Sequence, residues 1–427
     1  MRIAVIGSGI SGMVAASRLH RDHEVTVFEA GSYIGGHTHT RDVTWQGRQY
    51  AVDTGFIVFN DWTYPRFIAL LDELGVEYQD SNMSFSLRCE RTGLEYNGTN
   101  LNSLFAQRTN LLRPSFLRML ADILRFNKQS RELLAGGDDT LTLGDYLEAN
   151  RYSRVFREQY LVPMGKAIWS ASEQSMFTFP AKFFVEFFDK HGFLNVDHRP
   201  VWQVVKGGSR EYMRKLAAPF QHRVRLHTPV VGIRRDPAGV TVRTRSEEQR
   251  FDQVFIACHS DQALKLLRDA SPAEREVLGA FPYQYNEATL HTDESLLPRR
   301  KLARAAWNYH LLDPRLPRHG TDARELAALT YDMNVLQSLE APVRFLVTLN
   351  RGHDIDPARI IDSYVYHHPV YTPAGVAAQK RRAEISGVNR TFYCGAYWRY
   401  GFHEDGVVSA EWALAEFEQS MRMAAAV

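Results

Sequence analysis

The chain has 427 residues, of which 44% are hydrophobic and 23% are charged, and its formal net charge is +2. This length is enough for two domains and a large core, and a charge so close to zero argues against a general nucleic-acid-binding protein. No segment has the long apolar run that would cross a bilayer, and a first strand that begins at Arg2 leaves no room for a signal peptide. We therefore expect a cytoplasmic protein. Its three cysteines lie far apart and are expected to be reduced packing residues: Cys89, Cys258 and Cys394.

The first predicted strand, residues 2–6, runs directly into a G-x-G-x-x-G turn. Each glycine meets a separate steric need: Gly7 makes the tight turn, Gly9 lets the backbone approach a pyrophosphate, and Gly12 lets the next helix pack closely on the strand. The first turn of that helix, which includes Ser11, directs free N–H groups at the phosphates. The pattern predicts a dinucleotide site, whereas a chance turn is the alternative.

A second predicted strand, residues 24–29, ends in Glu29, twenty positions after Gly9. A carboxylate at this place accepts hydrogen bonds from the ribose of an adenosine and repels a 2′-phosphate. The expected cofactor is therefore FAD or NAD and not NADP.

The next stretch contains the pair Gly35-Gly36, followed by His37. A strand-end Glu followed by Gly-Gly resembles the extended FAD motif of the flavin amine oxidase superfamily, which includes monoamine and polyamine oxidases, protoporphyrinogen oxidase and the phytoene desaturases. The resemblance implies FAD as the cofactor. An Arg commonly follows the Gly-Gly pair in that family, so His37 changes one polar contact to the flavin or the pyrophosphate.

Two later segments extend the resemblance. Val230, in a predicted strand, matches a valine whose backbone contacts the adenine, although it is also an ordinary strand residue. Near the C-terminus, Gly395 ends a strand and Gly406 opens a helix together with Val407, which matches the closing motif at the flavin. The family usually has an acid after the first of these glycines, but here Ala396 and Tyr397 follow it. Upstream of Val230, a Gly-Gly turn resembles one near the family's substrate entrance and equally suits a plain helix start: Lys206-Gly207-Gly208-Ser209.

The fold class expected from the resemblance is α/β, with a Rossmann-type FAD-binding domain interleaved with an α+β substrate domain. The FAD-binding domain is expected to comprise residues 1–57, 196–265 and 386–427. The substrate domain is expected to comprise residues 58–195 and 266–385.

The substrate is harder to predict. Amine oxidases of the superfamily hold the amine between two aromatic rings, and His403 stands where one of those rings would come. Its presence weakens an amine interpretation, although Tyr397, Trp398 and Tyr400 are near enough in sequence to substitute.

Two stretches instead indicate a hydrophobic substrate. Six phenylalanines recur with helical spacing and either line a hydrocarbon tunnel or face the core: Phe177, Phe179, Phe183, Phe184, Phe187 and Phe188. Between Phe105 and Arg131 there are six basic residues and one acid. A basic amphipathic helix here either lies on anionic lipid or docks on the domain. Its apolar residues are Phe116, Met119, Leu120, Ile123 and Leu124.

The chain also resembles a bacterial subgroup of these flavoproteins that has a Trp-Asn-Tyr and a His-Pro-Val motif, found here at Trp307-Asn308-Tyr309 and His368-Pro369-Val370. Members of this subgroup are associated with cyclopropane-type fatty acyl methyltransferases. The resemblance implies dehydrogenation of a modified acyl chain, with a phospholipid as the partner and contact with a membrane surface.

Desaturation requires a hydride acceptor, which is the flavin, and a base for the neighbouring proton. His403 is the first candidate base, and His367 and His368 are alternatives, although a His-His-Pro run is also a structural turn. Glu404 and Asp405 are expected at a helix N-terminus, where the dipole favours acids, with Glu404 close to the cofactor. No His and acid spacing predicts a metal site.

Three functions therefore remain open: an FAD-dependent dehydrogenase of a lipid or acyl chain, an FAD-dependent amine oxidase, and a non-catalytic flavin or lipid carrier. The electron acceptor, oxygen or a quinone, is left open by the sequence, as are covalent attachment of the flavin and the oligomeric state.

Overall fold

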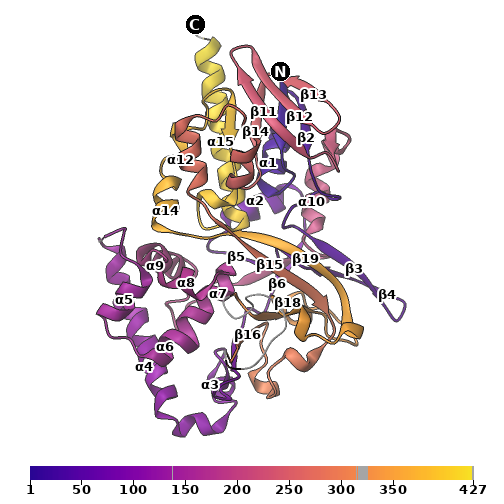
Figure 1. Cartoon of the computed structure of the whole chain (residues 1–427). Helices are drawn as coiled ribbons and strands as arrows, with labels where there is room; N and C mark the ends of the chain where they lie inside the picture. The colour runs from indigo at the N-terminus through magenta and orange to yellow at the C-terminus, as the bar shows by residue number, and fades with distance from the viewer. Residues whose placement is uncertain (137, 314, 316–325, 426–427) are drawn as a thin grey trace.

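The computed structural model describes residues 1–136, 138–313, 315 and 326–425. Figure 1 shows two halves stacked along the long direction of the molecule, with both chain ends in the upper half. Among the described residues, no helix combines the length and the apolar composition needed to cross a bilayer.

A five-stranded sheet forms the centre of the upper half. All of its neighbouring strands are parallel. Their spatial order is β10 (Val224–Arg225), β2 (Glu24–Phe28), β1 (Arg2–Ile6), β14 (Gln253–Ile256) and β20 (Thr391–Tyr393). Three separated parts of the chain therefore build one sheet, as the interleaved prediction requires.

Both faces of this sheet are covered, because successive side chains of a strand point to opposite faces. Ile3 and Val5 enter one cluster of buried residues, and Ala4 and Ile6 enter another. The first cluster includes side chains of α1 (Ile10–Leu19), α10 (Arg210–Ala217) and α15 (His403–Ala425). The second includes side chains of β11 (Val230–Asp236), β12 (Gly239–Thr244), β13 (Glu248–Phe251), α11 (Ser260–Leu266) and α12 (Pro272–Gly279). This three-layer arrangement is the predicted Rossmann-type fold.

The first predicted domain boundary lies after residue 57, but residues beyond it pack with the upper half. Phe67 and Leu71 of α2 (Pro65–Glu73) are fully buried in the same cluster as β1 and α1. A small antiparallel sheet also crosses this boundary, with strands β5 (Phe59–Asn60), β9 (Trp202–Val205) and β6 (Tyr78–Asp80). Residues 59–80 therefore belong with the upper half. The other predicted boundaries stay predictions.

A seven-stranded sheet dominates the lower half, and in Figure 1 its strands β15 and β19 reach the boundary between the halves. Its spatial order is β19 (Ile360–Pro369), β15 (Tyr283–His291), β18 (Leu346–Leu349), β17 (Leu329–Asp332), β16 (Trp307–Leu311), β7 (Phe85–Cys89) and β8 (Glu95–Asn97). A hairpin packs its apolar side chains against this sheet: β3 (Thr40–Trp45) and β4 (Arg48–Asp53). The motif residue Asn308 is buried in β16 and donates from its side chain to the Thr330 carbonyl oxygen at 3.2 Å, which is a structural role.

A group of helices, drawn in purple and magenta in Figure 1, covers the other side of the lower half. These helices are α3 (Leu101–Leu104), α4 (Pro114–Gln129), α5 (Leu143–Ala149), α6 (Arg154–Phe156), α7 (Val162–Trp169), α8 (Glu173–Phe177) and α9 (Ala181–Lys190). Two further short helices lie later in the chain: α13 (Met333–Leu336) and α14 (Pro373–Gln379).

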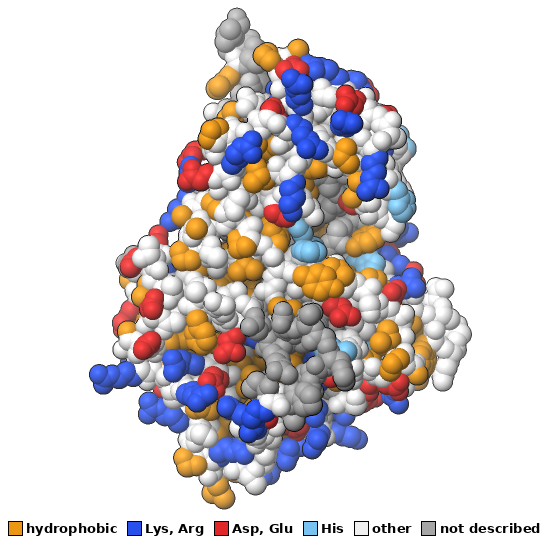
Figure 2. Space-filling view, viewed as in Figure 1, with side chains coloured by type: hydrophobic (Ala, Val, Ile, Leu, Met, Phe, Trp, Pro, Cys, Tyr) orange, Lys and Arg blue, Asp and Glu red, His pale blue; other side chains and the backbone are white. Residues whose placement is uncertain are grey.

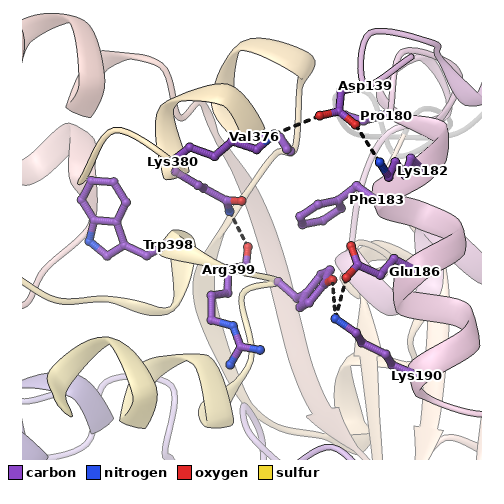
Figure 3. A pocket seen from close by; sticks show the side chains of 12 residues that line it. Asp139, Pro180, Lys182, Phe183, Glu186, Lys190, Val376, Lys380, Trp398 and Arg399 are labelled. Atoms are coloured by element: carbon purple, nitrogen blue, oxygen red, sulfur yellow. Dashed lines mark hydrogen bonds and ion pairs between the residues drawn. The ribbon is translucent and has the colours of Figure 1, made fainter. Parts of the chain in front are cut away.

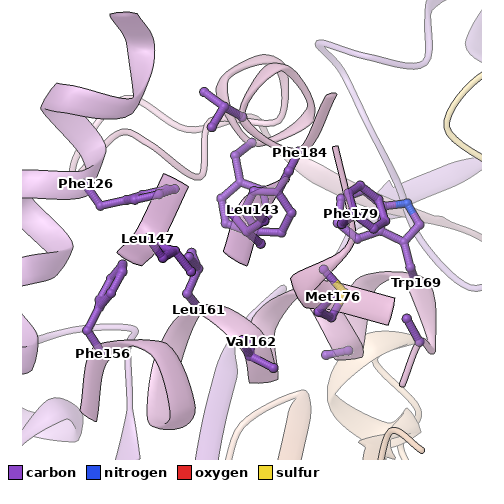
Figure 4. Close-up of a cluster of buried hydrophobic side chains, with 14 of the residues drawn as sticks. Phe126, Leu143, Leu147, Phe156, Leu161, Val162, Trp169, Met176, Phe179 and Phe184 are labelled. Atoms are coloured by element: carbon purple, nitrogen blue, oxygen red, sulfur yellow. The ribbon is translucent and has the colours of Figure 1, made fainter. Parts of the chain in front are cut away.

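The phenylalanine-rich stretch mainly builds the core of this helical group (Figure 4). Phe179 packs against Trp169 with ring centroids 4.7 Å apart, and Phe184 stacks on Phe188 at 4.2 Å. All four of these rings are buried. Of the two interpretations of the stretch, the core-facing helix is therefore the one that the structure supports.

Candidate functional site

The first turn of the chain has the predicted steric properties. Gly7 has a φ of +105°, and a Cβ on Gly12 would lie 2.0 Å from the Gly7 carbonyl oxygen. A Cβ on Gly9 would meet nothing within 4 Å, and Gly9 begins α1 without a side-chain cap. The turn therefore leaves free space and uncapped N–H groups at the start of a helix, which is a suitable place for an anion.

Glu29 lies directly beside this turn. Its carboxylate accepts hydrogen bonds from the Ser8 N–H at 2.9 Å, the Ser8 hydroxyl at 2.6 Å and the Gly31 N–H at 2.7 Å. A carboxylate has about four acceptor positions, so it still has capacity for a ribose hydroxyl. The Thr228 N–H donates to the Glu29 carbonyl oxygen at 2.8 Å, which brings the segment before Val230 alongside. The adenine contact of Val230 itself stays a prediction.

The Gly-Gly pair passes against the same turn. A Cβ on Gly35, whose φ is +141°, would lie 2.4 Å from the Thr38 carbonyl oxygen, and a Cβ on Gly36 would lie 3.2 Å from the Gly9 Cα. The next residue is His37, whose Nε2 atom is buried without a hydrogen-bond partner. Open space at Gly9, spare acceptor capacity at Glu29 and this unpaired nitrogen together fit a bound dinucleotide.

The C-terminal segment reaches the same place from the other side. A Cβ on Gly406 would lie 2.6 Å from Cγ2 of Ile10, so this glycine lets the start of α15 pack against the start of α1. Val407 is buried in the same hydrophobic cluster as Ile10. The Gly395 N–H donates to the Ser409 hydroxyl at 2.9 Å. Two helix N-termini therefore converge near the turn.

The two acids of α15 lie in its first turn, as predicted, but their carboxylates have partners within the protein. Glu404 accepts the N–H groups of Arg66 and Phe67 at 3.0 and 2.9 Å, and so caps α2. The predicted cofactor contact of Glu404 stays a prediction beside this capping role. Asp405 accepts the N–H of Phe402 at 2.9 Å. Burial raises the pKa of Asp405 to about 7, and nearby Arg399 opposes the shift.

His403 is buried at the start of α15. Its ring stacks on Phe56 with centroids 3.5 Å apart, and its Nε2 lies 3.0 Å from the Thr38 hydroxyl oxygen. Burial lowers the pKa of His403 to about 3. The imidazole is therefore neutral near pH 7 and a weak proton acceptor, which disfavours its predicted role as the base.

Of the other two candidate bases, His368 lies beside His37 and His367 lies beside His259. The rings of His37 and His368 are 5.3 Å apart, and His259 lies 6.2 Å from both His37 and His367. Burial, followed by repulsion from the surrounding histidines, His403 included, holds the pKa of His37 well below its usual range. Sequence reasoning missed His259, although its position just after β14, at the carboxyl edge of a parallel sheet, was a usable signal. In the part of the chain that is described, no group of His, Cys, Asp or Glu is arranged to hold a metal ion.

His368 has a fixed tautomer. The Asn286 side-chain oxygen accepts from Asn350 at 2.8 Å, so its NH₂ group faces Nδ1 of His368 at 3.1 Å and donates to it. Neutral His368 then carries its proton on Nε2 and acts there as a donor. His367 is exposed on β19, and none of the hydrogen bonds among the described residues engages its ring.

The aromatic residues that follow Gly395 separate into two groups. Tyr397 and Trp398 pack against Phe281, with centroids 5.2 and 5.5 Å away, and both are buried in the core. Tyr400 instead packs 4.6 Å from Phe183 of α9. Tyr397 is therefore a core residue, whereas Trp398 and Tyr400 also line a pocket.

A pocket of about 340 Å³ lies between α9 and the segment around Arg399 (Figure 3). Phe183 and Tyr400 contribute aromatic surface to its wall. Four cationic and two acidic side chains surround it: Lys182, Lys190, Lys380, Arg399, Asp139 and Glu186. Asp139 pairs with both Lys182 and Lys380, at 3.2 and 2.9 Å. The pocket is therefore lined by aromatic rings and has an excess of positive charge.

The Gly-Gly turn before α10 has a structural role. Gly208 has a φ of +92°, and its Cβ would lie 2.5 Å from Cγ2 of Thr40. The Ser209 N–H donates to the Asp53 carboxylate at 2.9 Å. Burial raises the pKa of Asp53 to about 6. This turn anchors α10 to the β3–β4 hairpin and does not line the pocket.

Comparison with known proteins agrees with this geometry. Residues 10–335 match the family model for flavin-containing amine oxidoreductases. No curated protein matches the sequence. Among solved structures, cyclohexylamine oxidase from Brevibacterium oxydans is 18% identical, with a TM-score of 0.71 and coverage of 98% of this chain and 99% of that one. A CLA-producing fatty acid isomerase from P. acnes is 16% identical, with a TM-score of 0.66 and coverage of 97% and 98%. A putrescine oxidase bound to putrescine is 14% identical, with a TM-score of 0.69 and coverage of 98% and 99%. At such identities, these likenesses establish the fold.

Proposed function

We propose that this chain, which belongs to the flavin-containing amine oxidoreductase family, dehydrogenates a hydrophobic acyl chain that carries an anionic head group. The protein is an FAD-dependent oxidoreductase of this family. The proposal concerns its substrate and the residues that act on it.

The residues around the first turn would hold the cofactor. The N–H groups at the start of α1 suit the pyrophosphate, Glu29 suits the ribose, and His37 offers its unpaired Nε2 beside Gly36. When bound, FAD supplies the hydride acceptor at N5. The protein contributes position and exclusion of water.

The excess positive charge of the pocket is the observation that carries the proposal. Four cations and two carboxylates line an aromatic wall, and Asp405 pairs with Arg399 at 3.4 Å, which leaves a net charge of +1 when Asp405 is ionised. A cationic amine is repelled by this excess, whereas a carboxylate or phosphate head group is attracted. The rings of Phe183 and Tyr400 offer apolar surface to the first part of a hydrocarbon chain.

His367 is the proposed proton acceptor. Dehydrogenation removes a hydride from one carbon and a proton from its neighbour, and the two electrons of the second C–H bond form the new double bond. The Asn286 contact makes His368 a donor at Nε2, and burial makes His403 a weak base, so we assign the role to the remaining candidate, the exposed His367.

Amine oxidation is the second candidate. The stacked pair of Phe56 and His403, at 3.5 Å, provides flat rings at the start of α15, and two structural neighbours are amine oxidases by name.

Charge reversal at the pocket tests the proposal. Lys380 lines the pocket, is largely exposed and pairs with Asp139, whereas Lys265 is equally exposed, pairs with Asp261 and lies outside it. We expect Lys380→Glu to raise the KM for an anionic acyl substrate roughly threefold to fivefold at low salt, with loss of the effect at high salt. The matched Lys265→Glu variant should behave like the wild type. An equal effect of both variants, or a lower KM with Lys380→Glu, would contradict the assignment of the pocket.

A further inference from the structure

The lower end of the molecule carries exposed leucines close to basic side chains (Figure 2). Leu112 is 87% exposed, Leu101 75% and Leu124 60%. We refer to the exposed leucines of this region together as the leucine surface: Leu101, Leu111, Leu112, Leu117, Leu124 and Leu302.

Of the apolar face that the sequence predicted for lipid contact, Leu124 is the one residue that belongs to the leucine surface. Phe116 and Met119 of that face are fully buried in the core of the helical group, so the docked-helix interpretation is correct for them. Leu117 and Leu124 are seven residues apart and therefore share another side of α4, which faces solvent. Core packing does not account for their apolar character.

The elements that carry these leucines adjoin one another. The η1 turn (Arg108–Leu112), which contains Leu111 and Leu112, leads directly into α4. Arg108 donates to the Phe105 carbonyl oxygen at 3.0 Å and so ties η1 to the end of α3. The short helix α3 packs in turn against η6 (Lys301–Ala303), which contains Leu302.

The charge of this region is positive and mostly not neutralised. Asp122 is the single acid among residues 101–131, and it is buried and paired with Arg118 and Arg125. Arg131 pairs with Asp189 at 2.9 Å. Arg108 and Arg113 donate to uncharged oxygens, and Lys128 has no acidic partner among the described residues.

We propose that the leucine surface docks the protein on an anionic lipid membrane, with the leucines entering the head-group region and the basic side chains contacting lipid phosphates. Exposed apolar side chains bordered by Lys and Arg have the composition of an interfacial membrane site. A second copy of the chain is a poorer occupant, because two such positive surfaces repel each other in a symmetric contact. The proposal does not depend on the identity of the substrate.

Vesicle flotation of the FAD-loaded protein tests this docking. We expect binding to vesicles of phosphatidylcholine with one-third phosphatidylglycerol, weak binding to phosphatidylcholine alone, and release at high salt. Leu111→Ser with Leu112→Ser should lower the fraction bound about tenfold, because two exposed leucines no longer enter the lipid. The matched control is Val388→Ser. Val388 is an apolar residue of the upper half and is 46% exposed.

Thermal melting of both variants establishes that they remain folded, which is expected because the replaced side chains are exposed. Unchanged binding of the double leucine variant would overturn the proposal, as would equal binding of the wild type to neutral and anionic vesicles. A wild-type dimer that becomes monomeric in the leucine variant, without vesicle binding, would assign the surface to a second copy and would also overturn it.

Discussion

Two glycines of the first turn are required for different physical reasons. Gly12 is needed by the fold itself, because any side chain there would collide with the Gly7 carbonyl oxygen. Gly9 has extended backbone angles that any residue adopts, and open space lies beside its Cα. Its lack of a side chain therefore serves a ligand.

Replacement of Gly9 separates these two requirements. We expect Gly9→Val to fold with a melting temperature close to that of the wild type but to purify without FAD, because the branched side chain occupies the space of the pyrophosphate. The absorbance at 450 nm and the thermal melt provide the two measurements. Gly136→Val is the control, since its site is also open but lies far from the turn in sequence. A yellow Gly9→Val protein would refute the cofactor assignment.

The assignment of His367 as the proton acceptor is also tested by single substitutions. We expect His367→Gln to slow reduction of the flavin by substrate about 100-fold, the usual contribution of a general base, while FAD content and melting temperature stay unchanged. His368→Gln is the comparison, because Nε2 of its ring donates and Nδ1 is already occupied by Asn286. Stopped-flow absorbance measures the rate. A larger loss in His368→Gln than in His367→Gln would reverse the assignment.

At the scale of elements, a buried ion pair joins three of them. Arg235 of β11 and Glu274 of α12 lie 2.5 Å apart, and the Tyr393 hydroxyl of β20 donates to Glu274 at 2.6 Å. Each charge is almost fully buried, so removal of one leaves the other without its main partner.

We expect Glu274→Ala to lower the free energy of unfolding by about 3 kcal/mol, the lower end of the usual range, because Asp269 still pairs with Arg235. Lys265→Ala removes an exposed ion pair at i,i+4 spacing and should cost less than about 0.5 kcal/mol. Urea denaturation measures both. Similar losses of unfolding free energy in the two variants would show that burial of the Arg235–Glu274 pair adds nothing to stability.

The difference between local and distant contacts explains which elements were predictable. The strand, turn and helix around Gly9 depend on neighbouring residues, and the sequence predicts them correctly. The capping of α2 by Glu404 joins positions 337 and 338 residues apart, so no local pattern announces it. The same holds for the packing of α2 on the parallel sheet, which moves residues 59–80 out of the predicted substrate domain. The phenylalanine stretch has the same periodicity in a core and in a tunnel, and only packing distinguishes them.

At the scale of the whole molecule, three distant segments meet at one carboxyl edge of the parallel sheet. This edge brings Gly9, His37, His259 and the start of α15 together, while β19 of the lower half adds His367 and His368. The interleaved chain therefore brings the residues proposed to hold the dinucleotide to the junction of the two halves, and the positively charged pocket lies where α9 faces the segment around Arg399.

Anaerobic titration of the FAD-loaded protein, followed at 450 nm, tests the central claim most directly. The account predicts bleaching of the flavin by an acyl lipid with an anionic head group, with one new double bond formed for each flavin reduced, and no bleaching by primary or polyamines. Bleaching by amines, with the flavin left oxidised by every acyl lipid, would contradict it.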